Sequence, residues 1–208
     1  MLLADAYLDR IDFLRYLPGT DCGACGVKTC EAFVHALKRG EKQPPDCPAM
    51  SESLYDSFHI ALEADHNLPK FTCVTDPRPG PIGVMEINRP GKASPVLISG
   101  NHVHTQDLLL AILSTTRSPF FLLFSDTRGN TVDMAIIFET LTAKQIKKDV
   151  ETSGILERIS HKDMIIPGLA AGVAHELKQI TDWNIIVGPV CAAELPLFMA
   201  DRWMPMGK

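Results

Sequence analysis

The sequence contains no long hydrophobic run, no basic cluster and no hydrophobic leader. Its apolar stretches, such as residues 107–116 and 118–124, are too short to span a bilayer. The opening 17 residues carry Asp and Arg among their apolar side chains, unlike a signal peptide. A formal net charge of −5 with no positive cluster disfavours nucleic acid and anionic membranes as partners. We therefore expect a globular, cytoplasmic protein.

A reducing compartment also disfavours disulfides, so the six cysteines of the chain need another explanation. In such a compartment cysteines are more often metal ligands or small buried residues. Four of them follow the spacing C-x2-C-x4-C-x16-C and are Cys22, Cys25, Cys30 and Cys47. The other two, Cys73 and Cys191, have no second cysteine or histidine at ligand spacing, and we expect ordinary thiols there.

The spacing of the four cysteines favours an iron–sulfur cluster over zinc. Zinc sites use two separated pairs, whereas three close thiolates and a distant fourth suit a cubane cluster. Gly19, Gly23 and Gly26 allow tight turns around such a cluster, and Pro48 follows the last cysteine as in bacterial ferredoxins. We predict a [4Fe–4S] cluster, with structural zinc and unmetallated thiols as the alternatives.

The chain divides into three parts by composition. Amphipathic patterns predict helices before Pro18, at 28–40 and at 51–65, which together form a helical 4Fe–4S domain over 1–65. A unit of this size usually needs a metal or a similar staple. Residues 66–95 are rich in proline and glycine and are predicted to be a connector, with at most a short strand at 70–74.

From residue 96 short apolar runs alternate with helical patterns. We expect strands at 95–99, 120–126, 163–167 and 183–188, and helices at 105–116, 142–151, 171–181 and 192–201. Thr105 is the predicted cap of the first of these helices, and Thr142 with Gln145 forms a predicted capping box. Continuous apolar strands separated by helices indicate an α/β sheet covered on both faces. The predicted fold class is therefore α/β, a small helical 4Fe–4S domain followed by a Rossmann-like α/β sandwich domain over 96–208.

Two regions resemble a known family. The segment LPGTDCGACGVKTCEAFVHALKRGEKQPPDCP, residues 17–48, closely resembles the N-terminal iron–sulfur domain of the large (gamma) subunit of corrinoid iron–sulfur proteins in the acetyl-CoA decarbonylase/synthase system. The segments 96–101, 122–132, 159–190 and 192–199 resemble the corrinoid-binding domain of that subunit, which also occurs in the corrinoid protein of bacterial mercury methylation.

The resemblance implies two cofactors, a low-potential 4Fe–4S cluster and a corrinoid (cobalamin). It implies that the cluster reduces a base-off corrinoid cobalt to Co(I), and that the chain is a methyl-group carrier and electron-transfer component rather than a stand-alone enzyme. The implied partners are a methyltransferase or TIM-barrel corrinoid partner protein and a low-potential electron donor. The family's large subunit has a TIM barrel between its two end domains, for which the connector here is too short.

A corrinoid site is expected where strands end. Ligands of open α/β sheets bind beyond the carboxyl ends of the strands, and a corrin needs small residues for close approach, apolar side chains and polar groups for its amide arms. The expected residues are Ser99, Asn101, His102, His104, Thr105, Thr127, Asp133, Met134, Gly168, Leu169, Gly172, Gly188 and Pro189. The cobalamin-binding pattern D-x-H-x-x-G is absent, so a histidine lower ligand from it is not expected.

Two features of the sequence depart from the family. By resemblance, Met134 stands at the position beneath the cobalt, where the family has threonine or cysteine. It is interpreted either as a weak axial thioether ligand or as apolar padding. The segment IIFET, residues 136–140, replaces a small, glycine-containing stretch. Two other functions therefore stay open, which are an iron–sulfur electron-transfer or binding module without its own corrinoid and a zinc-stapled ligand sensor.

Overall fold

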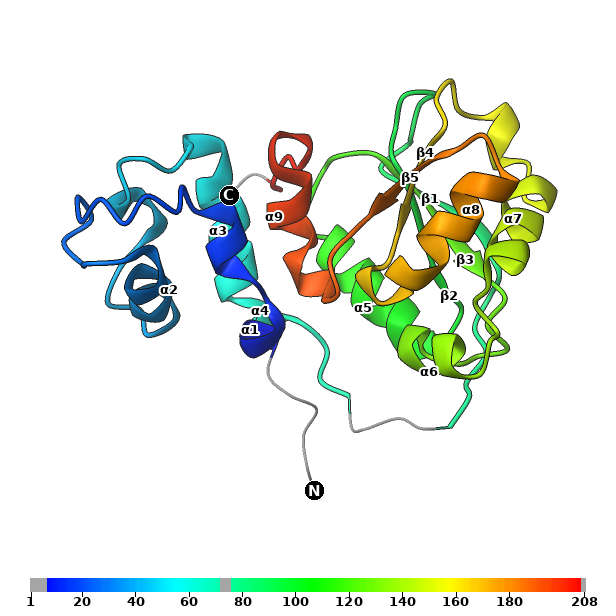
Figure 1. Cartoon of the computed structure of the whole chain (residues 1–208), viewed down its shortest axis with the longest axis horizontal. Coiled ribbons are helices and arrows are strands. Elements are labelled where there is room, and N and C mark those ends of the chain that lie inside the picture. Colours follow the sequence, from blue (N-terminus) through cyan, green and yellow to red (C-terminus); the bar gives the residue numbers. More distant parts are fainter. Residues whose placement is uncertain (1–6, 72–75, 207–208) are drawn as a thin grey trace.

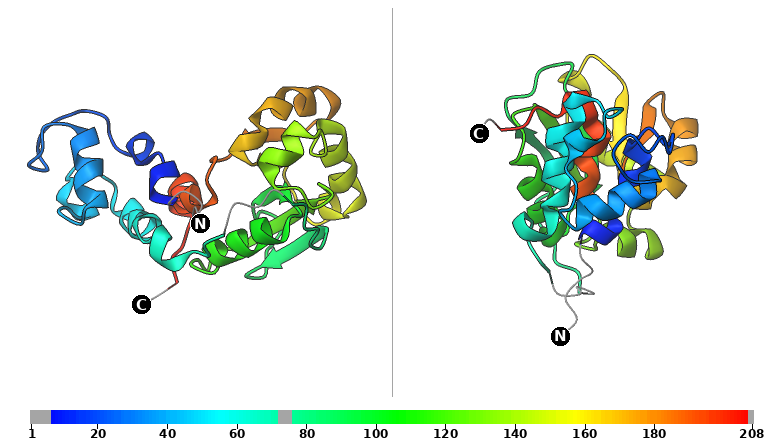
Figure 2. Two further views of the ribbon diagram at one scale, coloured as in Figure 1. Left: turned by 90° about the horizontal axis from the view of Figure 1, so that it is seen from below. Right: turned by 90° about the vertical axis from the view of Figure 1, so that its left-hand side faces the viewer.

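The computed structural model describes residues 7–71 and 76–206 (Figure 1). We call residues 7–71 the helical unit and residues 76–206 the α/β unit. Two views show them side by side, with the last helix of the chain, α9, between the sheet and the first helices (Figures 1 and 2). Residues 72–75, which include Cys73 and most of the predicted strand 70–74, lie outside the described residues.

The helical unit contains short helices joined by capped turns. They are α1 (Tyr7–Arg10), the 3-10 helix η1 (Phe13–Tyr16), α2 (Cys30–Lys38), α3 (Tyr55–Leu62) and α4 (Ala64–Asn67). The single helix predicted before Pro18 is therefore wrong in part. The Asp12 side chain accepts a hydrogen bond from the Arg15 N–H and starts a new turn, which divides the segment into α1 and η1.

The helices predicted at 28–40 and 51–65 are present, and local capping explains their bounds. Thr29 accepts a hydrogen bond from Ala32 N at 3.1 Å and starts α2. Gly40, with φ of +71°, follows its end. The second segment forms α3 and α4 rather than one helix, because the helix is interrupted at Glu63, which ends α3 and precedes α4.

A five-stranded mixed sheet forms the centre of the α/β unit, which confirms the predicted α/β class. Its strands are β1 (Gly83–Ile87), β2 (Val96–Gly100), β3 (Phe120–Ser125), β4 (Asp163–Ile166) and β5 (Asn184–Val187), in the order β1-β3-β2-β4-β5. Strands β2 to β5 are parallel, and β1 pairs with β3 in the antiparallel direction. After β2 the chain adds β3 on one side of it and β4 on the other, so the carboxyl ends of β2 and β4 define a topological switch point.

Helices cover both faces of the sheet. Helices α5 (Val103–Leu113) and α9 (Leu195–Met199) share one hydrophobic core with one face, and α7 (Ala143–Thr152) and α8 (Ala174–Ile180) share a second core with the other. Helix α6 (Val132–Ile137) packs against the turn that follows β4. No helix was predicted for these residues.

Three predicted helix starts are corrected. Helix α9 begins at Leu195 rather than at 192, after the 3-10 helix η6 (Ala192–Glu194). Helix α5 begins at Val103 rather than at Thr105, because His102 is its N-cap and accepts a hydrogen bond from His104 N at 3.1 Å. Helix α8 begins at Ala174 rather than at 171, after the 3-10 helix η5 (Gly168–Val173). Thr142 caps α7 by accepting a hydrogen bond from Gln145 N, as predicted, but the Gln145 side chain donates to Asp149 instead of completing the predicted capping box.

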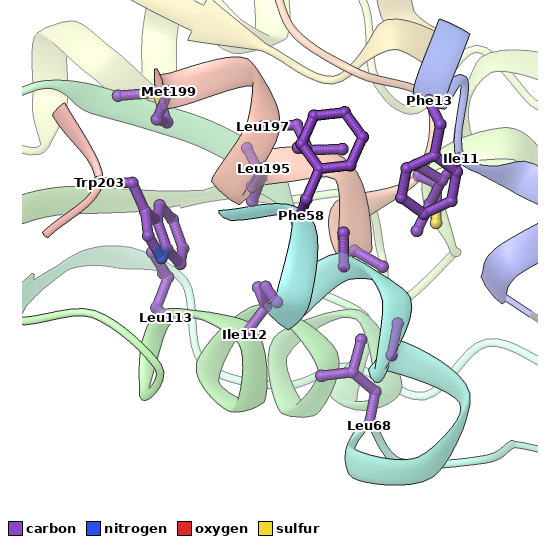
Figure 3. Close-up of a cluster of buried hydrophobic side chains, with 14 of the residues drawn as sticks. Ile11, Phe13, Phe58, Leu68, Ile112, Leu113, Leu195, Leu197, Met199 and Trp203 are labelled. Atoms are coloured by element: carbon purple, nitrogen blue, oxygen red, sulfur yellow. The ribbon is translucent and has the colours of Figure 1, made fainter. Parts of the chain in front are cut away.

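The core of the helical unit continues into the α/β unit. Phe13, Phe58 and Leu197 belong to one cluster of buried apolar residues that also includes Ile112 and Trp203 (Figure 3). Phe58 is completely buried in it, and its ring centroid lies 5.8 Å from that of Phe13. The helical unit therefore packs on α9 and α5 through shared apolar side chains. None of the described helices has the length and hydrophobicity that a membrane crossing requires.

Candidate functional site

All four predicted ligand cysteines line one cavity of the helical unit. Cys22 is exposed, Cys25 and Cys30 are half-buried, and Cys47 is buried. Pro18, Phe33 and Ala49 are among the other lining residues. The loop that carries Cys22 and Cys25 lies at the end of the molecule opposite the sheet (Figures 1 and 2). Four thiols separated by up to 25 residues in sequence thus face one small space.

Tight turns bring the first three cysteines together. Gly23 and Gly26 have φ of +70° and +82°, a conformation that other residues adopt only with strain. Gly26 N donates a hydrogen bond to Gly23 O at 2.9 Å and closes the turn that contains Cys25. Asp21 Oδ1 accepts a hydrogen bond from Cys30 N at 2.7 Å, which ties the start of the loop to the start of α2.

The distant fourth cysteine is held by its own capped turn. Pro44 to Asp46 form a 3-10 helix in which Asp46 Oδ2 accepts a hydrogen bond from Gln43 N at 2.8 Å. Cys47 N donates to Pro44 O at 3.2 Å, and the residue is 6% exposed. Cys47 therefore approaches the cavity from its buried side, opposite the exposed Cys22.

Hydrogen bonds favour the thiolate form of one cavity cysteine. The backbone of Ala24 and the side chain of Thr20 lower the pKa of the Cys22 thiol. The pKa of Cys191, which is buried among apolar residues of the shared core, is instead raised by burial. Since thiolates are the form that binds metals, the cavity thiol is the better donor of the two.

The thirteen residues predicted for a corrinoid site lie at the carboxyl ends of the parallel strands, which we call the carboxyl edge of the sheet. Ser99 and Asn101 are at the end of β2, Thr127 follows β3, and the histidines with Thr105 begin α5. Asp133 and Met134 are on the first turn of α6. The loops after β4 and β5 are joined there, because Gly168 N donates to Pro189 O and Gly188 N donates to Ile166 O, both at 2.9 Å. The loops after all four parallel strands thus contribute residues to this edge.

Two of the polar residues at this edge are committed to internal hydrogen bonds. Asn101 Oδ1 accepts from Thr127 N, Thr127 Oγ1 and Gly129 N at 2.9 to 3.1 Å. Thr127 Oγ1 also lies 2.7 Å from Asn130 O, so its one hydrogen is shared between two acceptors. Both Asn101 and Thr127 are buried, so they fix the loop after β3 against the end of β2.

The two histidines differ in their surroundings. His102 is completely buried; its Nδ1 accepts from His104 N, and burial lowers the pKa of its ring. His104 stacks on Phe71 with the ring centroids 4.3 Å apart, and Arg78 lies 3.5 Å from its Nε2. His102 is therefore part of the helix cap, and His104 lies at the surface between the two units.

A backbone segment that was predicted to be connector covers the end of β2. Arg78 N donates to Gly129 O at 2.8 Å, Gly80 N donates to Asn101 O at 2.6 Å, and Val103 N donates to Arg78 O at 3.0 Å. A Cβ atom at Gly129 would lie 2.3 Å from Pro79 N, so only glycine permits this contact. Residues 78–80 therefore cover the carboxyl end of β2 on the side where α5 begins.

The other side of the edge is open and apolar. Ile137 and Phe138, at the end of α6, are 68% and 58% exposed. Leu169 in η5 is 43% exposed, and Val190 after β5 is 61% exposed. Helix α6 packs against η5, and Gly168 lies against the backbone of Val190, so these four residues belong to neighbouring segments. We call them the apolar edge patch.

Two family models match this chain, one mainly over the α/β unit and one over the cysteine cavity. Residues 61–199 match the family model described as "CO dehydrogenase/acetyl-CoA synthase delta subunit". The chain belongs to this family. Residues 17–49, which contain all four cavity cysteines, match a model described as "Putative Fe-S cluster". The predicted resemblance is thus confirmed at the level of the family, and the Fe-S match supports an iron–sulfur cofactor.

The relatives of this family member are much longer proteins. It is 30% identical over 140 residues to the acetyl-CoA decarbonylase/synthase complex subunit gamma of Archaeoglobus fulgidus, covering 65% of this chain and 30% of that protein. It is 32% identical over 131 residues to the subunit of Methanopyrus kandleri, covering 61% and 28%. Subunit gamma 2 of Methanosarcina thermophila is 33% identical over 155 residues, covering 70% and 33%. The chain therefore spans about a third of the length of the relatives it matches.

The cysteine cavity of this family member fits an iron–sulfur cluster by its donor set. Four thiols line one space, and four thiolates are the ligands that a [4Fe–4S] cluster takes, one for each iron. Within the described ranges, no three His, Cys, Asp or Glu side chains come together as ligands of a single metal ion.

Three features of the family member were not predicted from sequence. The segment 78–81 was hidden by its proline and glycine content, which indicates a loop but not where the loop packs. The exposed pair Ile137 and Phe138 had a visible signal, since IIFET is an apolar run outside any predicted element. The contact of Glu194 with Tyr16 had none, because 178 residues separate the two.

Proposed function

We propose that the chain is a corrinoid iron–sulfur protein. The cavity of Cys22, Cys25, Cys30 and Cys47 holds a [4Fe–4S] cluster, and the carboxyl edge of the sheet holds a base-off corrinoid. The chain is a methyl-group carrier and electron-transfer component for a partner methyltransferase, not a stand-alone enzyme. The names of the relatives, which are subunits of an acetyl-CoA decarbonylase/synthase complex, support this role and support protein partners.

The single observation that carries the proposal is the convergence of the four cysteines on one cavity. Phe33 and the buried Cys47 form its apolar side and keep water from that part of the space, while the Ala24 backbone and the Thr20 side chain hydrogen-bond to Cys22. Hydrogen bonds to sulfur and limited solvent exposure both tune the potential of a cluster.

The apolar edge patch supports a corrinoid at the sheet. A corrin is a large, mostly apolar disc, and neighbouring exposed apolar side chains beside a switch point are typical of a ligand site. Gly168 lets the Val190 backbone approach closely, which brings the loops after β4 and β5 together under the patch, and the half-buried Met134 lies on the helix that ends in the patch. When bound, the corrinoid supplies a cobalt that carries the methyl group, and the cluster supplies the electron that keeps the cobalt in its reactive reduced state.

We further propose the extent of the parts and their setting. The helical cluster domain covers 1–65, the connector 66–95, of which residues 83–87 join the sheet as β1, and the corrinoid-binding domain 96–208. The partners are a methyltransferase or a TIM-barrel corrinoid partner protein, together with a low-potential electron donor, in the cytoplasm. The absence of a membrane-crossing helix among the described residues is compatible with this setting.

Anaerobic reconstitution tests the proposal. The full chain is supplied with iron, sulfide and cobalamin, desalted and examined by absorption spectroscopy. We expect the broad visible absorption of a cluster together with resolved corrinoid bands of the base-off form. Phe138→Ser should weaken retention of the corrinoid and leave the cluster absorption unchanged. The matched control is Met206→Ser, which should change neither. Met206 has a similar exposure (57%), and its N–H donates to Thr115 O just after the last residue of α5, away from the carboxyl ends of the strands.

A second candidate is an iron–sulfur electron-transfer module without its own corrinoid. The internal hydrogen bonds of Asn101 and Thr127 favour it, because these groups are not free to bind the amide arms of a corrin. In the same experiment this module would show the cluster absorption but no retained corrinoid in the unsubstituted chain.

A further inference from the structure

A buried carboxylate of the α/β unit contacts the helical unit just before the cysteine loop. Glu194 closes the 3-10 helix Ala192–Glu194 that precedes α9, and it is 4% exposed. Its Oε1 accepts a hydrogen bond from Tyr16 Oη at 2.6 Å, and its Oε2 accepts one from Asp12 N at 3.3 Å. Both carboxylate oxygens are thus used across the contact between the two units, where a buried carboxylate needs hydrogen bonds to be stable.

The two donors bracket one short turn. Asp12 is the N-cap of η1 and Tyr16 is its last residue, so Glu194 binds both ends of η1. Phe13, between them, is buried against Phe58 in the shared core, which orients the turn (Figure 3). Burial and the neighbouring Glu194 carboxylate raise the pKa of Tyr16, which keeps its hydroxyl group protonated as a donor.

The turn leads directly into the cysteine cavity. Pro18, two residues after Tyr16, lines the cavity, and Cys22 follows four residues later. Phe33 belongs both to the lining of the cavity and to the shared core over α9. The cavity is therefore attached to the α/β unit by the apolar packing of Phe33 and, through the chain segment that precedes Pro18, by the hydrogen bonds of Glu194.

We propose that Glu194 is a positioning residue for the cysteine cavity, because through Tyr16 and Asp12 it holds the chain segment that places Cys22. The contact fixes the exposed side of the cavity, where the backbone has fewer buried neighbours than at Cys47. The inference has two tests. The spectroscopic test rests on the proposed cluster, whereas the hydrogen-exchange test uses the chain without metal and does not.

Amide hydrogen exchange of the full chain without added metal tests the position of the loop. Tyr16→Phe and Glu194→Ala should speed exchange of peptides covering residues 17–30 by about tenfold to a hundredfold, since each removes a hydrogen bond to a charged group. Glu194→Gln should have a smaller effect, because its amide oxygen still accepts from the tyrosine. The control is Tyr7→Phe, which removes a hydroxyl group that donates to Pro69 O and does not touch Glu194.

The reduced, reconstituted cluster gives a second signature. Its electron paramagnetic resonance spectrum should change in Tyr16→Phe and Glu194→Ala and match the parent in Tyr7→Phe. Exchange of residues 17–30 at the parent rate in both Tyr16→Phe and Glu194→Ala would overturn the positioning role, as would faster exchange over the whole chain in these two variants. A parent chain that binds no iron would overturn the proposed cluster instead, and the exchange comparison would still decide the role of Glu194.

Discussion

At the scale of single residues, the cysteine cavity depends on backbone conformations that favour glycine. Gly26 has φ of +82° in the turn between Cys25 and Cys30, and Gly40 has φ of +71° after α2. A Cβ atom at Gly26 would meet only Lys42 Nζ at 3.5 Å, and one at Gly40 would meet nothing within 4 Å. The cost of a substitution at either position is therefore backbone strain rather than collision.

This pair separates strain from ligand geometry. Gly26→Ala and Gly40→Ala should each lower the free energy of unfolding of the metal-free chain by about 1 kcal/mol, the cost of a left-handed conformation for a residue with a Cβ atom. Only Gly26→Ala should also lower the iron bound after reconstitution, because its turn orients Cys25. Denaturant unfolding and iron analysis measure the two effects. Equal iron content in both variants would show that the turn does not set the ligand geometry.

At the scale of elements, the start of α5 combines a helix cap with a buried titratable ring. His102 caps the helix through Nδ1, and burial lowers the pKa of the ring, against a smaller opposing effect from the Asp76 backbone. His104, Arg78 and Asp133 are the charged or titratable groups that act on it. Because the folded pKa is below the unfolded value of about 6.5, the unfolded chain binds the proton first as pH falls. The stabilising effect of the neutral ring is complete above about pH 6.5 and is lost below it.

His102→Asn should flatten the pH dependence of stability. Asparagine is a good N-cap residue and does not titrate, so the variant keeps the cap without the proton linkage. Denaturant unfolding at pH 8 and at pH 5.5 should show a smaller loss of stability in His102→Asn than in the parent chain. His175→Asn, at an exposed position, is the control and should behave as the parent. An equal loss in the His102 variant and the parent would contradict a buried neutral histidine.

At the scale of the whole molecule, sequence patterns predicted what depends on nearby residues. Strands β2 to β5 are continuous apolar runs, and the cysteine spacing is a local pattern, so both could be read directly. Strand β1 could not, because its half-exposed residues lie in a segment rich in proline and glycine. The continuous core of Phe58, Leu197 and Ile112 depends on packing between distant segments, which no local pattern encodes.

Native mass spectrometry of the anaerobically reconstituted full chain tests the central claim most directly, because it counts every group bound to one molecule. The account predicts a protomer mass increased by one [4Fe–4S] cluster and one corrinoid, with the cluster increment lost when Cys47 is replaced by serine. A protomer that carries a single zinc ion, or no added mass, would contradict it.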